Sequence, residues 1–486
     1  MRNPIAVGVA YLLVLLFLAA PSRGAAPEGQ ALTSRLSALV ARPNGLSSDL
    51  VAGRATATSF TLRQRREEVA AAIAGVNQAI VALMPRLTLL ARYVRLSDVG
   101  PSNLGNVAVP PPMLPQGPIP TGTPLFNVPI ELPVILNQTT LQATLAVPIS
   151  DYLLRLPMLH AAARATRDAA RATEAATRLQ VATDGRVAYY GWARARLSGV
   201  VAEAAVTQAK AHREVARRLF DAGVVSKADT MRVEAQLAAS ELFLERARDL
   251  EVVLAEQLRI AMHDEQKAGY EIGEDLQAEL PPLAEEPLAS LADEAWAHRL
   301  EPAALRDAVR AQRAQTNVVR GAALPQLAAF GDLVDANPNP RFFPYRDAYD
   351  FTWDVGVQLS WTPNESALNG LGAAGAAARA RALDAQLGAL RDAVRFEVVQ
   401  LYEAAREADF AVQSTRRGLE AAEESYRVRR ELFQHGRSTS FEMTDAETDV
   451  TQARLGALGA RIDQRITRAR LQHALGRDVD RVDPSR

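Results

Sequence analysis

The chain contains no cysteine, so it can form no disulfide and offers no cysteine as the site of a lipid anchor. Its charges nearly cancel, with 55 Lys and Arg against 56 Asp and Glu, and this balance gives no indication of a nucleic-acid partner. Aromatic residues make up only 6% of the 486 residues, whereas alanine is abundant. A GC-rich genome would also enrich alanine, but the composition favours long helices over a large globular core.

Long apolar runs are missing except at the N-terminus. Residues 5–20, IAVGVAYLLVLLFLAA, follow Arg2 and precede the small residues of PSRGAAPEG. The run is shorter than the ~20 residues of a membrane-spanning helix and has the charged and small flanks of a secretory signal peptide. We therefore predict a signal peptide over residues 1–26, cleaved after Gly24 or Ala26, although Pro27 disfavours the second site. The mature protein is expected to be exported.

One segment, residues 349–363 (YDFTWDVGVQLSWTP), alternates apolar and polar residues without a miss. This period of two predicts a long strand with one apolar and one polar face. The predicted apolar face consists of Tyr349, Phe351, Trp353, Val355, Val357, Leu359 and Trp361. Further strands are predicted at 87–97, 137–147 and 327–334. The second alternates cleanly, whereas Arg92 and Asp332 fit a polar face less well. Residues 101–133 are rich in proline and predict an extended surface loop.

Most of the remaining chain is predicted to be helical, at 32–84, 155–221, 226–262, 289–323, 368–433 and 439–476. Two stretches occur twice. Residues 81–93 (VALMPRLTLLARY) match 321–333 (GAALPQLAAFGDL), and RRLFDAGVVSKADTMRVEAQ at 217–236 matches RELFQHGRSTSFEMTDAETD at 430–449. The sequence therefore predicts a tandem duplication. Its parts are a first repeat (27–262), an acidic linker (263–288) and a second repeat (289–486), each repeat containing two strands and a very long helix.

Four strands are too few to enclose a lumen, for which about eight are needed. Yet a strand of ~10 residues with apolar and polar faces and aromatic ends has the pattern of an outer-membrane strand. We therefore expect several chains to contribute four strands each to one barrel, with the apolar face toward lipid. The alternative is the edge of a soluble β-sandwich, which does not explain why so few strands interrupt so much helix.

Other motifs give weak signals for chemistry. GLGAAG at 370–375 matches the GxGxxG of dinucleotide sites, but the preceding strand alternates where a buried parallel strand would be continuously apolar. We interpret these glycines as easing a strand-to-helix transition. The six histidines (His160, His212, His263, His298, His435 and His473) show no metal-ligand spacing and are interpreted as helix-surface residues. We predict no enzyme activity, no cofactor and no metal site.

The two glycine-containing turns are the most informative local motif. Gly223 and Gly436 follow long predicted helices, as a left-handed C-terminal glycine does. Ser226-x-x-Asp229 and Thr439-x-x-Glu442 then predict capping boxes for the next helices. Asp445, one turn beyond Glu442 on the same helix face, is not explained by capping.

These repeated junctions and turns, LMPRL/ALPQL and LFDAGVVSKAD/LFQHGRSTSFEMTD, resemble the outer-membrane efflux protein family, the TolC-like channel-tunnels. The resemblance covers nearly the whole mature chain. It implies a mixed α and β, mostly α fold, in which a homotrimer forms a twelve-stranded outer-membrane β-barrel continued by a long α-helical periplasmic tunnel. It also implies an outer-membrane location in a Gram-negative bacterium and two partners, a periplasmic adaptor protein and an inner-membrane transporter.

The resemblance also assigns roles to residues. The adaptor-docking turns would be Gly223, Val224 and Val225 with Gly436, Arg437 and Ser438. An acidic ring at the periplasmic entrance maps onto Glu442 and Asp445. A closing network would join Asp229 to a tyrosine and an arginine of the second turn, where this chain has Phe433 and Ser438, with Arg437 adjacent.

The function that we expect is a passive export duct of a tripartite efflux or type I secretion system. The alternative is a periplasmic coiled-coil adaptor or scaffold that does not span the membrane.

Overall fold

The computed structural model describes residues 28–98, 102–111, 117–132, 134–265 and 269–478. The predicted signal peptide lies outside these residues. The chain forms two compact units, each built from parts of both sequence halves. Unit 1 contains residues 1–62, 177–299 and 394–486, and unit 2 contains residues 63–176 and 300–393. The two long helices α4 (Leu156–Asp221) and α8 (Pro363–Gln434) each contribute to both units. The division into two tandem repeats stays a prediction.

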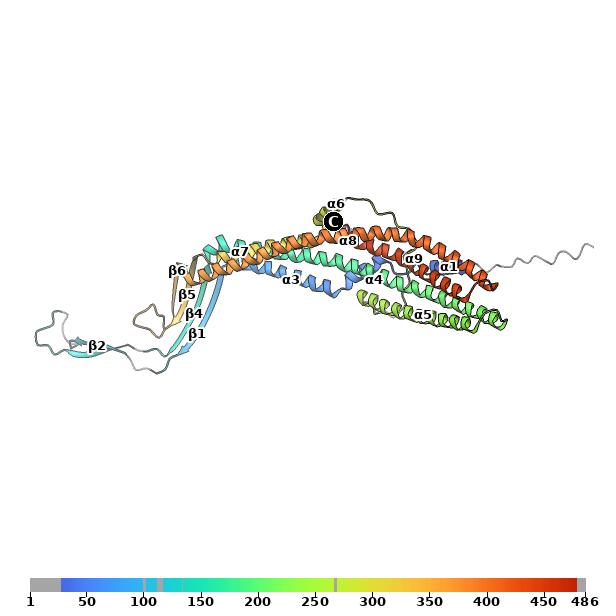
Figure 1. The fold of residues 1–486 in the computed structure, drawn as a ribbon. Coiled ribbons are helices and arrows are strands. Elements are labelled where there is room, and N and C mark those ends of the chain that lie inside the picture. Colours follow the sequence, from blue (N-terminus) through green and yellow to red (C-terminus); the bar gives the residue numbers. More distant parts are fainter. Residues whose placement is uncertain (1–27, 99–101, 112–116, 133, 266–268, 479–486) are drawn as a thin grey trace, which may run out of the picture. The chain divides into compact units, whose positions relative to one another are not determined.

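Unit 2 contains an antiparallel sheet with the strand order β1-β4-β5-β6 (Figure 1). The strands are β1 (Arg86–Arg95), β4 (Asn137–Val147), β5 (Gln326–Asn337) and β6 (Asp350–Ser360). Each of the four predicted strands is therefore present, and β4 has the predicted bounds. The two edge strands, β1 and β6, each leave one side without a strand partner among the described residues.

The register of this sheet sorts its side chains into two faces. Residues directly opposite each other in antiparallel strands lie on the same face. One row across the sheet is Leu89, Ala143, Leu333 and Trp353, and the neighbouring row is Thr88, Thr144, Asp332 and Asp354. In these two rows the apolar and polar positions of four separate strands coincide, whereas Asp335 falls on the apolar face and Leu90 on the polar face. Asp332, which fitted its strand poorly by sequence, belongs to the polar face.

Hydrogen bonds stabilise the polar face of the sheet. Asp332 accepts hydrogen bonds from the Gln142 side chain at 2.9 Å and from the Thr144 hydroxyl. Arg341, from the loop after β5, donates to an Asp354 carboxylate oxygen at 2.5 Å and to the carbonyl oxygen of Trp353 at 2.8 Å. The β5–β6 loop therefore folds back onto β6.

The proline-rich segment is not only a loop, as the sequence had predicted. It contains an antiparallel pair, β2 (Ser102–Val109) and β3 (Phe126–Leu132), with an irregular register between Asn103 and Asn106. Pro129 lies within β3, paired with Asn106. An isolated two-stranded sheet has two open edges, where proline's missing N–H is tolerated.

Helices of unit 2 continue from the strands. They are α3 (Phe60–Val81), which begins in unit 1, α7 (Leu300–Gly321), and the adjoining parts of α4 and α8. A short π-helical segment, Asp151–Arg155, precedes α4. The GLGAAG glycines lie inside α8, which begins at Pro363, so the interpretation as a strand-to-helix transition is wrong. Proline suits the first turn of a helix, so α8 begins at Pro363 and not at the predicted residue 368.

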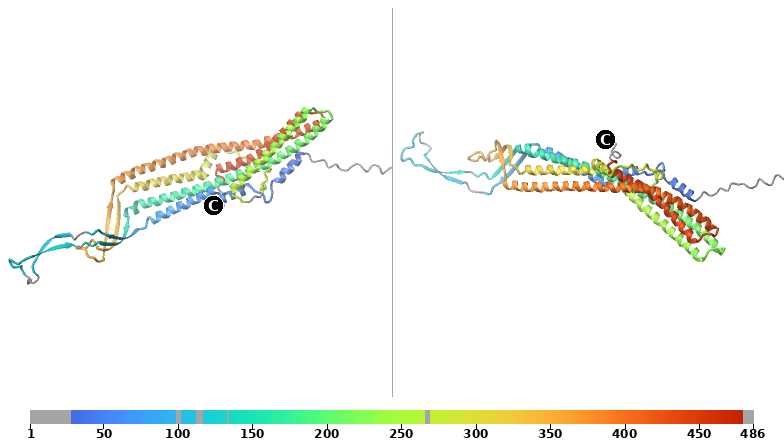
Figure 2. Two further views of the ribbon diagram at one scale, coloured as in Figure 1. Left: turned by 90° about the horizontal axis from the view of Figure 1, so that it is seen from below. Right: turned by 45° about the horizontal axis from the view of Figure 1, so that its top comes forward.

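Unit 1 consists of α1 (Glu28–Leu39), α2 (Ser48–Thr58), α5 (Lys227–Met262), α6 (Leu288–His298), α9 (Ser440–Ala474) and the ends of α4 and α8. Figure 2 shows α4, α5, α8 and α9 running side by side toward two turns.

The hydrophobic core of unit 1 centres on five buried residues, Trp192, Tyr189, Leu258, Ile272 and Ile462. Within the described residues, no helix is both long enough and apolar enough to cross a membrane.

The acidic linker is bound to α9 of unit 1 by hydrogen bonds from arginine side chains. Arg465 donates at 2.9 Å to the carbonyl oxygens of Asp275 and Ala278, and Arg468 donates at 3.1 Å to that of Pro281. The linker also passes so close to Gly45 that a side chain on Gly273 would meet the Gly45 carbonyl oxygen at 2.4 Å. Glycine at both positions permits this approach.

Two predicted helices are interrupted. The prediction 32–84 is divided into α1, α2 and α3, because Pro43 and Gly45 separate the first two and Ser47 caps the second. The prediction 289–323 is divided at Arg299, whose backbone is extended and whose buried side chain binds Glu397 at 2.5 Å. Both breaks use side-chain contacts that helical periodicity alone does not reveal.

Candidate functional site

The two glycine turns of unit 1 have the same backbone geometry. The first turn is residues 222–226, between α4 and α5, and the second turn is residues 435–439, between α8 and α9. Gly223 has φ of 73° and Gly436 of 68°, the left-handed conformation predicted for both. The N–H of Val224 donates to the carbonyl of Leu219 at 2.8 Å, and that of Arg437 to the carbonyl of Leu432 at 2.9 Å. Both are Schellman motifs, which end one helix sharply and turn the chain back.

Both predicted capping boxes are present and start the return helices. Asp229 accepts hydrogen bonds from the backbone N–H of Ser226 at 3.0 Å and from its hydroxyl at 2.6 Å. The Ser226 side chain and backbone together lower the pKa of Asp229. The carboxylate is therefore held ionised at the N-terminus of α5, where the helix dipole also favours negative charge.

The Glu442 carboxylate has one more partner than the Asp229 carboxylate, an arginine of the neighbouring helix. Its carboxylate accepts from the Ser438 hydroxyl at 2.6 Å and from the Thr439 N–H at 3.1 Å, and it pairs with Arg429 of α8 at 2.7 Å. The Ser438 hydroxyl, followed by the Thr439 N–H and Arg429, lowers the pKa of Glu442 to about 2. Ser438, predicted as a docking residue, therefore also orients Glu442, which was predicted as an entrance acid. Arg429 was not predicted, because its contact depends on how the helices pair.

The two turns touch each other. A side chain on Gly436 would lie 3.2 Å from the Val224 methyl carbon Cγ1, whereas nothing lies within 4 Å of the corresponding position on Gly223. Arg232 of α5 stacks over the ring of Phe441 in the first turn of α9, at 4.8 Å from its centroid. The turns thus form one surface, in which Gly436 is required both for its positive φ and for its proximity to Val224.

The other predicted gate residues are solvent-facing. Asp445 and Arg437 are exposed, and their side chains make no hydrogen bond or ion pair with any residue that the structure describes. Asp449, one further turn along α9, is also exposed and shares the helix face of Glu442 and Asp445. Asp449 was not predicted as an entrance acid, although its helical spacing from Asp445 could have revealed it.

The predicted closing network is not formed within one chain. Asp229 is bonded to its own capping residue, and Phe433 is only 2% exposed and packs its ring edge-to-face on His212 at 4.8 Å. His212 of α4 instead contacts Glu447 of α9, with Nδ1 and Oε2 3.1 Å apart and both side chains buried. This buried pair links α4 to α9 and packs against Phe433, the position at which the resemblance implied a tyrosine.

Histidines are therefore not all on helix surfaces, as the sequence analysis had them. His212 is buried in this pair, and His473 is buried between Asp478 at 2.8 Å and Gln180 at 3.1 Å. Glu447 lies 235 residues from His212 along the chain, and Gln180 lies 293 residues from His473. No local motif could have revealed the contacts with Glu447 and Gln180.

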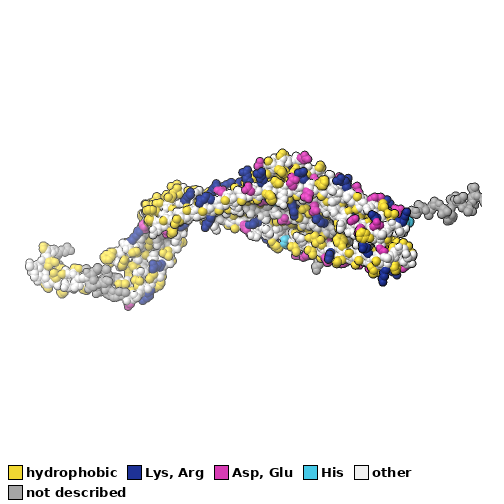
Figure 3. Space-filling view, in the orientation of Figure 1, with side chains coloured by type: hydrophobic (Ala, Val, Ile, Leu, Met, Phe, Trp, Pro, Cys, Tyr) yellow, Lys and Arg dark blue, Asp and Glu magenta, His cyan; other side chains and the backbone are white. Residues whose placement is uncertain are grey.

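The strand predicted to face lipid presents its apolar side chains to the outside of the chain. The members Tyr349, Phe351, Trp353, Val355, Val357, Leu359 and Trp361 are all at least 58% exposed. The exposed Leu87 and Leu89 of β1 extend the same face, and Figure 3 shows hydrophobic side chains gathered over the strands. So large an apolar surface on an isolated chain marks a lipid or protein contact.

Residues 291–477, which include α7, β5, β6, α8 and α9, match the family model described as outer membrane efflux protein. Residues 291–477 therefore belong to this family. They identify the protein as a non-enzymatic transport protein of the outer membrane, and they include the second turn with Glu442 and Asp445.

Solved structures extend the similarity of this efflux protein across its length. The outer-membrane channel OprN matches with a TM-score of 0.69 at 18% identity, over 91% of this chain and 95% of that chain. The CmeC outer membrane channel of Campylobacter jejuni matches with a TM-score of 0.69 at 14% identity, over 91% of each chain. The open state of the Neisseria gonorrhoeae MtrE outer membrane channel matches with a TM-score of 0.69 at 16% identity, over 88% of each chain. At these identities the comparison shows that the fold is that of a TolC-like channel. No curated protein matches the sequence.

Proposed function

We propose that this efflux protein is the outer-membrane component of a tripartite efflux or type I secretion system and acts as a passive export duct. Three chains would pair their sheets edge to edge into a twelve-stranded barrel, and their helices would continue it as a periplasmic tunnel. A periplasmic adaptor would dock on the first and second turns, and an inner-membrane transporter would supply the energy.

The observation that carries this proposal is the sheet with two faces and two open edges. Its apolar face is exposed on every strand, and its polar face is hydrogen-bonded through Asp332 and Asp354. Unpaired strand edges are not stable in lipid, so a sheet that meets lipid must close on itself. Because β1 and β6 run in opposite directions, β6 of one chain can pair antiparallel with β1 of the next.

Cysteine cross-linking tests this closure directly, because the chain has no cysteine of its own. We would combine Leu89→Cys on β1 with Phe351→Cys, Val355→Cys or Leu359→Cys on β6. Oxidation in membranes should yield a covalent trimer for at least one pair, and Leu333→Cys alone, on the inner strand β5, should yield none.

The alternative function, a periplasmic coiled-coil adaptor or scaffold, predicts a different behaviour. The membrane fraction of a duct should contain a trimer whose migration changes on heating, extracted only by detergent. A stable, monodisperse monomer in aqueous buffer without detergent would exclude the duct.

A further inference from the structure

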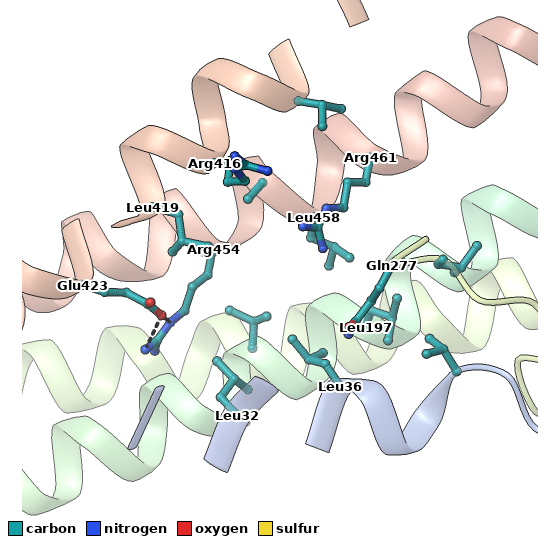
Figure 4. A pocket seen from close by; sticks show the side chains of 15 residues that line it. Leu32, Leu36, Leu197, Gln277, Arg416, Leu419, Glu423, Arg454, Leu458 and Arg461 are labelled. Atoms are coloured by element: carbon teal, nitrogen blue, oxygen red, sulfur yellow. Dashed lines mark hydrogen bonds and ion pairs between the residues drawn. The ribbon is translucent and has the colours of Figure 1, made fainter. Parts of the chain in front are cut away.

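Unit 1 contains a cavity of about 190 Å³ that none of the features above uses. It lies between α8 and α9 on one side and α1, α4 and the linker on the other (Figure 4). Its apolar lining includes Leu36 of α1, Leu197 of α4, Leu276 of the linker, Leu419 of α8 and Leu458 of α9. A dry engineered cavity of ~150 Å³ holds benzene, so this one has room for a single small ring or a short alkyl chain.

The polar part of the lining is strongly biased toward positive charge. It has three arginines (Arg416, Arg454 and Arg461) against one glutamate, Glu423. Arg454 is buried and already bound to Glu423 at 3.2 Å, as the dashed lines in Figure 4 show. Arg416 is exposed and pairs with Glu279 at 3.3 Å.

Arg461 is different, because its side chain makes no hydrogen bond or ion pair with the described residues, although it is only partly exposed. A guanidinium group offers five N–H donors suited to a carboxylate, sulfonate or phosphate. An unpaired guanidinium beside an apolar slot is complementary to a molecule with an apolar body and an anionic end.

We propose that this cavity binds a small amphipathic organic anion, with its apolar part between Leu36, Leu197 and Leu458 and its anionic group on Arg461. An occupant would contact α1, α4, the linker, α8 and α9 at once. It would therefore favour the conformation in which these segments are packed together, by its differential affinity for that state. The site does not depend on the export function, because it is built entirely within unit 1.

A matched set of three probes tests both halves of the site in the purified, detergent-solubilised protein. 3-(4-Fluorophenyl)propionate, the corresponding alcohol and the corresponding amine share one body and differ in charge. We expect ¹⁹F line broadening that saturates for the carboxylate, weaker binding of the alcohol and none of the amine. Arg461→Gln should lower the affinity for the carboxylate on the order of tenfold and leave the affinity for the alcohol unchanged. The contact that is lost is a hydrogen bond to a charged group.

The controls separate a built site from general adsorption. Arg470→Gln removes an exposed arginine of the same helix that does not line the cavity and should change nothing. Ala457→Leu fills the slot and should abolish binding of carboxylate and alcohol alike, and Leu36→Phe provides a second filling variant. No saturable binding, equal binding of alcohol and carboxylate, or an unchanged carboxylate affinity in Arg461→Gln would each overturn the proposal.

Discussion

Single residues control the two turns through contacts that the sequence reveals only in part. The capping boxes at Ser226 and Thr439 could be predicted because each is complete within four residues. The pairs Arg429–Glu442 and His212–Glu447 could not, because they join different helices and depend on helix packing. The predicted roles of Asp229 and Arg437 in closing stay predictions, because a bond between chains requires the trimer.

The lowered pKa of Glu442 gives a pH-dependent prediction. The folded pKa of about 2 lies below the ~4.3 of an unfolded glutamate, so ionised Glu442 stabilises the start of α9 above ~4.3. That stabilisation is lost as the pH falls toward 2. We expect Glu442→Gln to speed amide hydrogen exchange at 439–443 near neutral pH, with a difference from wild type that disappears near pH 2. Asp445→Asn, which removes an acid without partners, should leave exchange unchanged at both pH values.

Gly436 should be less tolerant of substitution than Gly223. Alanine at either position adopts a left-handed backbone at a cost of roughly 1–2 kcal/mol. Only at Gly436 does the new methyl group also press on Val224, at 3.2 Å. We expect Gly436→Ala to reduce adaptor-dependent export more than Gly223→Ala, with equal amounts of trimer in the membrane. Equal export by the two variants would contradict a docking surface shaped by the contact between the turns.

Secondary-structure elements were predictable where their pattern is regular. Strands β4 and β6 were found from alternation alone, and the long helices from composition and repeated turns. The β2–β3 pair was missed because proline dominates its segment. The start of α8 at Pro363 was missed because its early glycines suggest a loop. The β2–β3 pair depends on strand pairing that the local sequence does not reveal, whereas the start of α8 follows from Pro363, which suits the first turn of a helix.

The register of β6 predicts opposite responses at neighbouring positions. Val357 lies on the apolar face and is 73% exposed, whereas Gln358 lies on the polar face opposite Ala328. If the apolar face meets lipid, Val357→Arg should cost about 2–4 kcal/mol near the bilayer midplane, and Gln358→Arg should be tolerated. The measurement is the yield of assembled trimer in the membrane. The reverse order would mean that the two faces are assigned the wrong way round, as a register slip of one residue would do.

At the scale of the whole molecule, the sequence could not define the properties that depend on assembly. One chain shows an apolar face, two strand edges without a partner among the described residues, and a row of acids. In the proposed trimer, each of these features would meet a neighbouring chain. The repeated junctions and turns were sufficient to indicate the family by resemblance. In that trimer, the lumen that three chains line together would decide which molecules pass through the duct.

The exposed acids of α9 give the prediction that depends most on assembly. Asp445 has no partner among the described residues, in contrast to Glu442, which is neutralised in part by Arg429. If three copies of α9 line a narrow entrance, three Asp445 carboxylates converge there, with Asp449 one turn further on. Rings of carboxylates attract cations and repel anions in a narrow aqueous pore. Single-channel recordings should therefore show cation selectivity and block by multivalent cations from the periplasmic side.

Removal of the unpaired Asp445 carboxylate should affect the block by multivalent cations more than removal of the Glu442 carboxylate, which is paired with Arg429. Asp445→Asn should weaken the block strongly, Asp449→Asn to a smaller extent, and Glu442→Gln least, because Arg429 and the capping box already occupy that carboxylate. All three changes preserve side-chain size, and neither Asp445 nor Asp449 belongs to the capping box, so a difference between these two variants reports charge rather than local structure. A channel whose selectivity and block are unaffected by Asp445→Asn would show that Asp445 is a solvated surface acid, and the acidic ring would then have to be sought on another helix.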